Sequence, residues 1–287
     1  MSNREQDNSN LVESTQGQAG SKFIRWLDAF LDKLYRNRWE ADPPEGIDGK
    51  IWGMPSVAPS FPWMSNYSDR ESYFLHYFQS QGCGPTDNEC VTTSALISMN
   101  MLKDWIATQH GHSHEPDQDI DTYTRQLDAL GLQGWKYRFS TNSPLPGMMT
   151  PWQAIIALKD HAKSLGERYG KSYKVKLSAH HTLMDLIARL QKGDIVLIHG
   201  AWQWTFDRTP LLPLLGGMPH TMLLIGFDGN TSQWLLLNPG DPFYRKNDET
   251  GIPKIFKMST KKLMDFWGRR FLFYPPRFAL TTITLDP

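Results

Sequence analysis

Apolar residues repeat at helical spacing through much of the chain, while short and almost continuous apolar runs appear toward its end. The helical repeat is clearest over residues 84–102, where Val91 begins a stripe typical of a buried helix face. Further helices are predicted over residues 117–130, 150–165 and 181–191. The pattern therefore predicts a helical region that precedes a β-rich one.

Three apolar runs follow one another at residues 192–200, 220–227 and 234–237, each bounded by turn-forming residues. Strands that are consecutive in a chain commonly pair in opposite directions. With the helices before them, these runs predict an α+β fold in which helices pack on an antiparallel sheet.

The start of the chain has a different character. Residues 1–20 are polar and rich in Ser, Asn and Gln, which predicts a disordered N-terminus. An apolar stripe over residues 22–38 predicts an amphipathic helix that docks on the domain or on a protein partner; its interspersed acidic residues argue against a membrane surface. A Pro-rich stretch completes an extension over residues 21–62, leaving residues 63–287 as one domain.

Charge and cysteine content exclude several classes of protein. The chain has 30 basic and 30 acidic side chains, so no nucleic-acid partner is indicated. Two cysteines cannot build a disulfide framework, and no apolar run is long enough for a membrane span. The polar start lacks the features of a secretory signal, which predicts a cytoplasmic location.

Cys83 stands where a helix is predicted to begin, just before Gly84 and Pro85. The positive end of a helix dipole favours a thiolate there, so Cys83 is a candidate nucleophile. Cys90 follows seven residues later, about 10 Å along an intact helix, which excludes a disulfide between the two. Cys90 is interpreted as a small buried apolar residue.

His220 opens the second apolar run, and Asn238 and Asp241 follow the third. In adjacent antiparallel strands, a side-chain oxygen from either residue could meet the imidazole N–H of His220. A thiol, an imidazole and a group that orients the imidazole form the usual arrangement for nucleophilic catalysis. An enzyme is therefore the leading interpretation.

With these motifs the chain resembles the papain-like superfamily and, within it, the bacteriocin-processing-type cysteine peptidases, the thirty-ninth cysteine-peptidase family, and their stand-alone relatives. The resemblance covers roughly residues 75–278. It rests on Cys83-Gly84-Pro85-Thr86, on the segments 193–198 and 220–228, and on Leu236-Leu237-Asn238-Pro239. It implies a papain-like α+β fold, with the nucleophile helix packed on an antiparallel sheet. A closing strand at 253–259, a helix at 260–267 and a last strand at 270–274 also look like this family.

The resemblance implies that Cys83 is the nucleophile, His220 the base and Asn238 the residue that orients the base. The family usually has Asp where this chain has Asn238, so Asp241 stays a rival. A larger departure from the family's pattern concerns Tyr77.

Such peptidases place a glutamine of the oxyanion hole six residues before the nucleophile, and that position here is Tyr77. Gln79 is taken as the donor, with Gln81 as the other nearby glutamine and the backbone N–H of Cys83 as the second donor.

The function implied is a cysteine peptidase that cleaves a peptide or small amide through a thioester, with no cofactor. An acyltransferase could use the same residues. The alternative from another class is a catalytically silent papain-like domain that binds a peptide or partner, and Tyr77 favours it.

The other histidines are given structural or solvent-exposed roles. His110, His112 and His114 fall in a polar segment and are interpreted as an exposed loop, so no metal site is predicted. His199 ends an apolar run and is expected to be structural, although it could line the same cleft as His220. The long connection at 201–219 is a candidate for substrate specificity.

Overall fold

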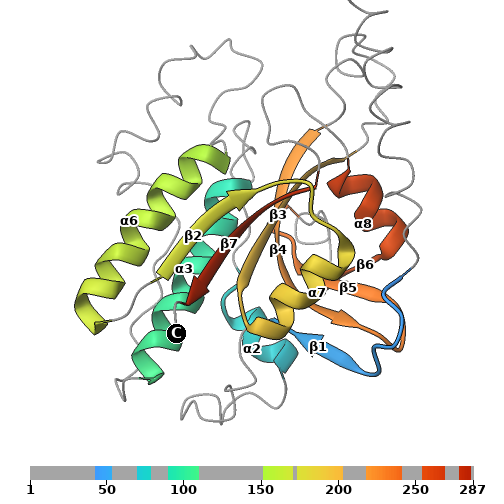
Figure 1. Ribbon diagram of the computed structural model, residues 1–287, viewed down its shortest axis with the longest axis horizontal. Helices are drawn as coiled ribbons and strands as arrows, with labels where there is room; N and C mark the ends of the chain where they lie inside the picture. The colour runs from blue at the N-terminus through green and yellow to red at the C-terminus, as the bar shows by residue number, and fades with distance from the viewer. Residues whose placement is uncertain are drawn as a thin grey trace, which may run out of the picture.

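The computed structural model describes eight stretches of the chain, which together build one sheet with helices on both of its faces. The described residues are 43–53, 70–78, 90–109, 151–170, 173–202, 218–240, 254–268 and 278–285. They contain a seven-stranded sheet in which every strand pair is antiparallel, together with five helices (Figure 1). The predicted α+β class is confirmed.

The sheet does not follow the order of the chain. Six strands lie in the order β2 (Tyr173–Ser178), β7 (Ala279–Leu285), β3 (Ile195–Trp202), β4 (Met218–Asp228), β5 (Gln233–Leu237) and β6 (Phe256–Ser259), and β1 (Lys50–Trp52) pairs with the end of β4. The three predicted consecutive strands correspond to β3, β4 and β5, which are neighbours and antiparallel as expected.

Helices cover both faces of the sheet. On one face α2 (Arg70–His76), α3 (Cys90–Gln109) and α6 (Pro151–Tyr169) share a core with Ile195 and Leu197 of β3. On the other face α7 (Leu183–Lys192) and α8 (Thr260–Trp267) pack with Val196 and Ile198. Figure 1 shows α3 and α6 on one side of the strands and α8 on the other.

This double coverage differs from the expected single helical half. Its physical reason is the composition of β3, in which the first seven residues are buried, so both alternating sets of side chains need an apolar partner. A strand with one solvated face would alternate apolar and polar residues instead.

The first turns of α3 lie against β4 beside His220. The Ser94 hydroxyl donates a hydrogen bond of 3.1 Å to the carbonyl oxygen of Thr221. The thiol of Cys90, one turn earlier, also lies close to the backbone of Thr221. The beginning of α3 is therefore fixed next to the residue that follows His220.

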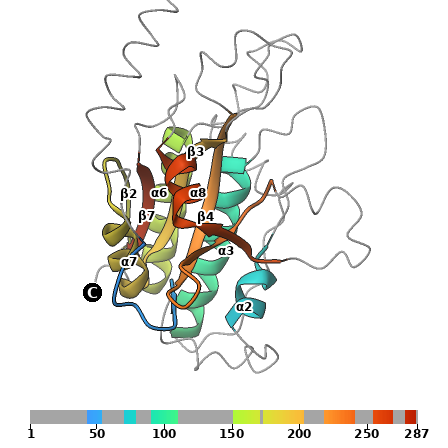
Figure 2. The same cartoon turned by 90° about the vertical axis from the view of Figure 1, so that its right-hand side faces the viewer.

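The later turns of α3 lie toward the opposite end of β4. The Tyr77 hydroxyl donates to Asp104 of α3 at 2.9 Å. Phe74 of α2 stacks on Trp52 of β1, with ring centroids 5.6 Å apart, and Trp52 pairs with Gly226 near the end of β4. Thus α3 follows the direction of β4, as Figures 1 and 2 both show.

The remaining predicted elements agree with the structure in part. The helix expected at 260–267 is present as α8, and its N-cap is Ser259, whose hydroxyl accepts from the N–H of Lys262. The helix expected to start at residue 181 begins at Leu183, because the capping residue is Thr182. Four elements were missed, namely β1, α2, β2 and β7.

The Pro-rich extension is partly built into the sheet. Within the region described, residues 50–52 form β1 on β4, and the N–H of Gly53 donates to the carbonyl of Ile225 at 2.7 Å. This segment pairs with Gly226, Phe227 and Asp228, not with the His220 end of the strand.

Several predicted segments lie outside the described residues. They are the polar start at 1–20, the helices at 22–38 and 117–130, the loop at 110–114, most of the connection at 201–219 and the strand at 270–274.

None of the helices in the described part of the chain is long and apolar enough to cross a bilayer.

The close packing of α8 against Gly200 of β3 leads to a prediction about the stability of the fold. A Cβ atom at Gly200 would collide with the carbonyl oxygen of Phe266 and lie 2.7 Å from Cε1 of its ring. We expect Gly200→Ala to lower the free energy of unfolding by about 1–3 kcal/mol, the usual cost of overpacking. Urea unfolding followed by circular dichroism measures this value. A variant as stable as the wild type would show that α8 does not pack this closely.

Candidate active site

Two of the predicted site residues meet at one end of the sheet. His220 is the third residue of β4, and Asn238 directly follows β5. Both side chains are buried, with 4% of their surface exposed. The Nε2 atom of His220 lies 2.7 Å from Oδ1 of Asn238.

The strand register explains why these residues meet. Leu223 and Leu224 of β4 lie opposite Leu237 and Leu236 of β5. Continued by one residue, the register puts Asn238 opposite the residue two positions after His220. The two side chains are then diagonal neighbours on one face, a separation that long side chains can bridge.

A second hydrogen bond to Asn238 defines the protonation of the imidazole. The backbone N–H of Gly240 donates to Oδ1 of Asn238 at 3.1 Å, which identifies this atom as the amide oxygen. An oxygen only accepts, so the neutral ring of His220 must carry its hydrogen on Nε2. The lone pair is then on Nδ1, the atom that can take a proton.

Aromatic side chains surround the imidazole on the α8 face. The ring centroid of Trp202 lies 6.2 Å from that of His220, and the ring of Phe266 lies 6.4 Å away in a T-shaped arrangement. Trp202 and Phe266 also contact each other, with centroids 4.7 Å apart. Apolar rings lower the local dielectric, which strengthens the hydrogen bond between His220 and Asn238.

Phe266 approaches because the residue opposite His220 has no side chain. Gly200 of β3 pairs with His220 of β4. The carbonyl oxygen and the ring of Phe266 occupy the space that a side chain on Gly200 would need.

The remaining predicted site residues lie outside the described residues. These are the predicted nucleophile Cys83, the oxyanion candidates Gln79 and Gln81, and Asp241, the rival of Asn238. Nε2 of His220 donates its hydrogen bond to Asn238, and the choice between Asn238 and Asp241 stays a prediction.

Tyr77 is a buried structural residue. Its side chain is 1% exposed, and its hydroxyl is bonded to Asp104 of α3. Asp104 follows Ser94 by ten residues along α3, a distance of about 15 Å by helix rise. Tyr77, which stands where the resembled family has glutamine, therefore makes its hydrogen bond far from the end of β4 that carries His220.

Cys90 has the properties of a buried apolar residue, as predicted. It is 6% exposed, and burial raises the pKa of its thiol to about 11. A thiol with such a pKa is almost entirely protonated near neutral pH, so Cys90 is a poor nucleophile.

His199 is buried on the opposite face of the sheet from His220. Its Nδ1 lies 2.9 Å from the hydroxyl of Thr221, and its Nε2 lies 2.8 Å from the hydroxyl of Thr281. Burial lowers the pKa of His199 to about 3. The expected structural role is confirmed, whereas the suggestion that His199 lines the same site as His220 is wrong. Gly200 pairs with His220, and His199, the residue before Gly200, points to the opposite face of the sheet.

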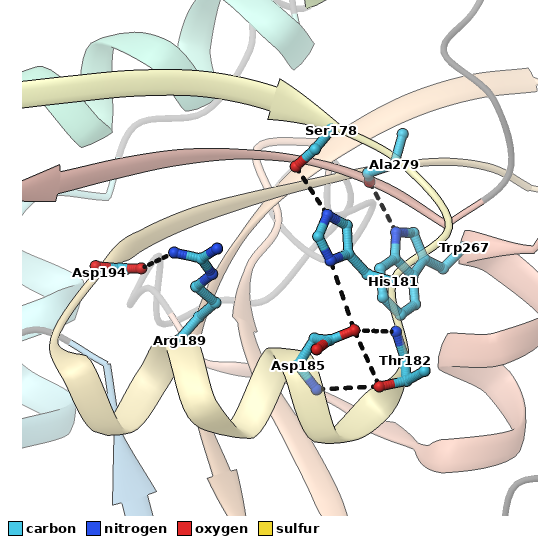
Figure 3. A network of polar contacts seen from close by, with 8 residues as sticks. All are labelled: Ser178, His181, Thr182, Asp185, Arg189, Asp194, Trp267 and Ala279. Atoms are coloured by element: carbon cyan, nitrogen blue, oxygen red, sulfur yellow. Dashed lines mark hydrogen bonds and ion pairs between the residues drawn. The ribbon is translucent and has the colours of Figure 1, made fainter.

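A Ser–His–Asp chain at the start of α7 is explained by helix capping and not by catalysis (Figure 3). Nε2 of His181 lies 2.8 Å from the hydroxyl of Ser178, and its Nδ1 lies 3.6 Å from Oδ2 of Asp185. The same carboxylate oxygen accepts from both the N–H and the hydroxyl of Thr182, and Thr182 caps α7 in return. This is a capping box that includes a neighbouring histidine.

The second end of α7 is fixed by an ion pair. Arg189 donates to Asp194 at 2.9 Å, and the carboxylate of Asp194 is almost fully buried. Gly193 between them adopts a φ of 77°, which lets the chain leave the helix and enter β3. The Gly-Asp pair of the sequence motif thus joins α7 to the strand.

Within the stretches described, no group of three or more His, Cys, Asp and Glu residues is arranged to hold a metal ion. No protein-family model matches the chain, and a comparison with curated protein sequences finds no match either. The functional interpretation therefore rests on the residues of the site and their contacts.

Burial of His199 predicts a loss of stability in acid. Its pKa is about 3 in the folded protein and about 6.5 in an unfolded chain. The unfolded state therefore binds more protons below pH 6.5, and stability falls as the pH is lowered toward 3. Lowering the pH from 7 to 5 should therefore reduce the free energy of unfolding by about 2 kcal/mol through His199.

The variant His199→Gln keeps a donor and an acceptor but does not titrate in this range. Urea unfolding at pH 7 and pH 5 should show a smaller loss in this variant than in the wild type. Equal losses would contradict the assignment of a neutral, buried imidazole.

Proposed function

We propose that the protein is a papain-like cysteine peptidase in which Cys83 is the nucleophile, His220 the base and Asn238 the residue that orients the base. The observation that carries the proposal is the buried hydrogen bond of 2.7 Å between Nε2 of His220 and Asn238. It leaves Nδ1 as the basic atom of the neutral ring, in a site partly enclosed by aromatic residues.

The course of α3 supports Cys83 as the nucleophile. This helix follows the direction of β4, and its first residue, Cys90, contacts the backbone of Thr221 beside His220. The seven residues from Cys83 to Cys90 span about 10 Å in a helix and at most about 25 Å when extended. Cys83 is thus tethered to the end of α3 that lies against the backbone of Thr221, the residue after His220.

The catalytic cycle follows from these roles. Nδ1 of His220 takes the proton of the Cys83 thiol, and the thiolate attacks the carbonyl carbon of a peptide or amide. The tetrahedral intermediate collapses to a thioester as the imidazolium gives its proton to the leaving amine. Water then attacks the thioester and passes a proton to Nδ1, and the acid product leaves with the thiol restored.

Asn238 acts by orientation. Its oxygen fixes the ring of His220 and is itself fixed by the N–H of Gly240. The amide is neutral, so it holds the imidazole without adding a negative charge beside the developing imidazolium.

The oxyanion is stabilised by the backbone N–H of Cys83 and by a nearby glutamine. Tyr77 lies beside Asp104, toward the opposite end of α3 from Cys90. Gln79 follows Tyr77 by only two residues, whereas Gln81 stands closer to Cys83. Chain length therefore favours Gln81 over Gln79 in this role.

The bond between Tyr77 and Asp104 also supports one alternative. It shows a structural use for the position where the resembled family has its oxyanion glutamine. A domain without that donor could bind a peptide without cleaving it. The reactivity of Cys83 separates the two functions, because a binding domain does not need an ionised thiol.

The peptidase proposal predicts an unusually reactive Cys83. We expect iodoacetamide to label Cys83 at pH 6 about tenfold faster, or more, in the wild type than in His220→Ala, because an imidazolium stabilises the thiolate below the ordinary thiol pKa of about 8.5. Mass spectrometry of the Cys83 peptide, with the pH varied from 5 to about 9, measures the rate.

The matched control is His181→Gln, which changes the histidine of the capping box at the start of α7. It should leave the labelling profile of Cys83 near that of the wild type. Ordinary thiol behaviour of Cys83 in every variant would refute the proposed pair and favour the peptide-binding alternative.

A further inference from the structure

The carbonyl of Thr221 connects the beginning of α3 to the strand that carries His220. The Ser94 hydroxyl donates to this carbonyl at 3.1 Å, and both residues are 0% exposed. The thiol of Cys90, four residues earlier, lies close to the backbone of the same residue. Two successive turns of α3 therefore lie against the backbone of Thr221, directly beside His220 in the chain.

The side chain of Thr221 continues this contact across the sheet. Its hydroxyl is bonded to Nδ1 of His199, and Nε2 of His199 is bonded to the hydroxyl of Thr281. Ser94, Thr221, His199 and Thr281 belong to α3, β4, β3 and β7. All four are buried, so a polar chain crosses the core on the α3 face of the sheet.

Apolar packing alone would not set the position of α3. Every residue from Cys90 to Asp104 is buried, so the helix has no solvated face that would fix its rotation. Apolar burial is non-directional and tolerates small shifts of a helix along its axis. A hydrogen bond depends on distance and angle, and a buried polar group without a partner is costly.

We propose that Ser94 is a positioning residue, which fixes α3 along β4 so that the chain preceding the helix presents its thiol to His220. The inference rests on the proposed function, since it assigns Ser94 a role in the reactivity of Cys83. A shift of α3 by one turn would be about 5.4 Å, which is larger than the span of a hydrogen bond between a thiol and an imidazole.

The chain offers a matched control one turn further along. The Ser98 hydroxyl donates to the carbonyl of Ser94 within the same helix, at 2.8 Å, and is equally buried. Ser98→Ala removes a buried hydroxyl from α3 without removing a bond to the sheet. Ser94→Ala removes the bond to β4.

The experiment measures iodoacetamide labelling of both cysteines at pH 6 and pH 8 by mass spectrometry. We expect Ser94→Ala to slow labelling of Cys83 at pH 6 about tenfold relative to Ser98→Ala, with the difference shrinking at pH 8, where an ordinary thiol also ionises. Cys90 is buried, so its labelling in the same samples reports opening of α3.

Each outcome is decisive. Equal Cys83 profiles in the two serine variants would overturn the positioning role, and so would a change accompanied by faster labelling of Cys90, which would indicate general loosening. Ordinary thiol behaviour of Cys83 in the wild type itself would refute the proposed function, and the positioning role with it.

A second variant keeps the test usable if Ser94→Ala does not fold. Thr221→Val retains the carbonyl that accepts from Ser94 but disconnects His199. It should slow Cys83 labelling at pH 6 by a smaller factor, with Cys90 still protected. A profile identical to the wild type would contradict a role for the polar chain.

Discussion

The pairing of β4 with β5 is the constraint on which the site depends. Asn238 reaches His220 because Leu223 lies opposite Leu237 and the register continues to the strand ends. A slip of one residue would turn every side chain of the strand to the other face. The register shifts between Leu224 and Gly226, so the irregularity falls away from His220, and the pairing that places the imidazole remains regular.

The helices on the two faces of the sheet make different contacts around His220. On the α8 face, Trp202 and Phe266 enclose the imidazole, which is possible because Gly200 leaves room for the helix. On the α3 face, Ser94 and Thr221 join the helix to the strand one residue away from His220. His220 and α3 are thus held by separate sets of contacts that meet in β4, and Figure 2 shows α3 alongside this strand.

Local pattern predicted the parts of this arrangement that local chemistry determines. The turn residues around the apolar runs identified β3, β4 and β5, and strand adjacency then predicted that Asn238 or Asp241 lies beside His220; the structure shows the contact of Asn238. The last strand, β7, was missed although its β-branched residues are a strand signal; only its insertion between β2 and β3 depends on long-range pairing that local pattern does not specify. β1 has only three residues in a Pro-rich stretch, too few for a visible alternation. The face of His199 and the bond of Tyr77 to Asp104 depend on tertiary contacts, which spacing alone does not specify.

Proximity of Cys83 to His220 is the central claim, and a bifunctional haloketone such as 1,3-dibromoacetone tests it most directly. This reagent alkylates a thiolate and then an imidazole nitrogen within reach of its three-carbon bridge. Treatment of the full chain, followed by digestion and mass spectrometry, should give one cross-linked peptide that joins Cys83 to Nδ1 of His220, since Nε2 is bonded to Asn238. Alkylation of Cys83 without a bridge to His220, or with a bridge to another histidine, would contradict the account.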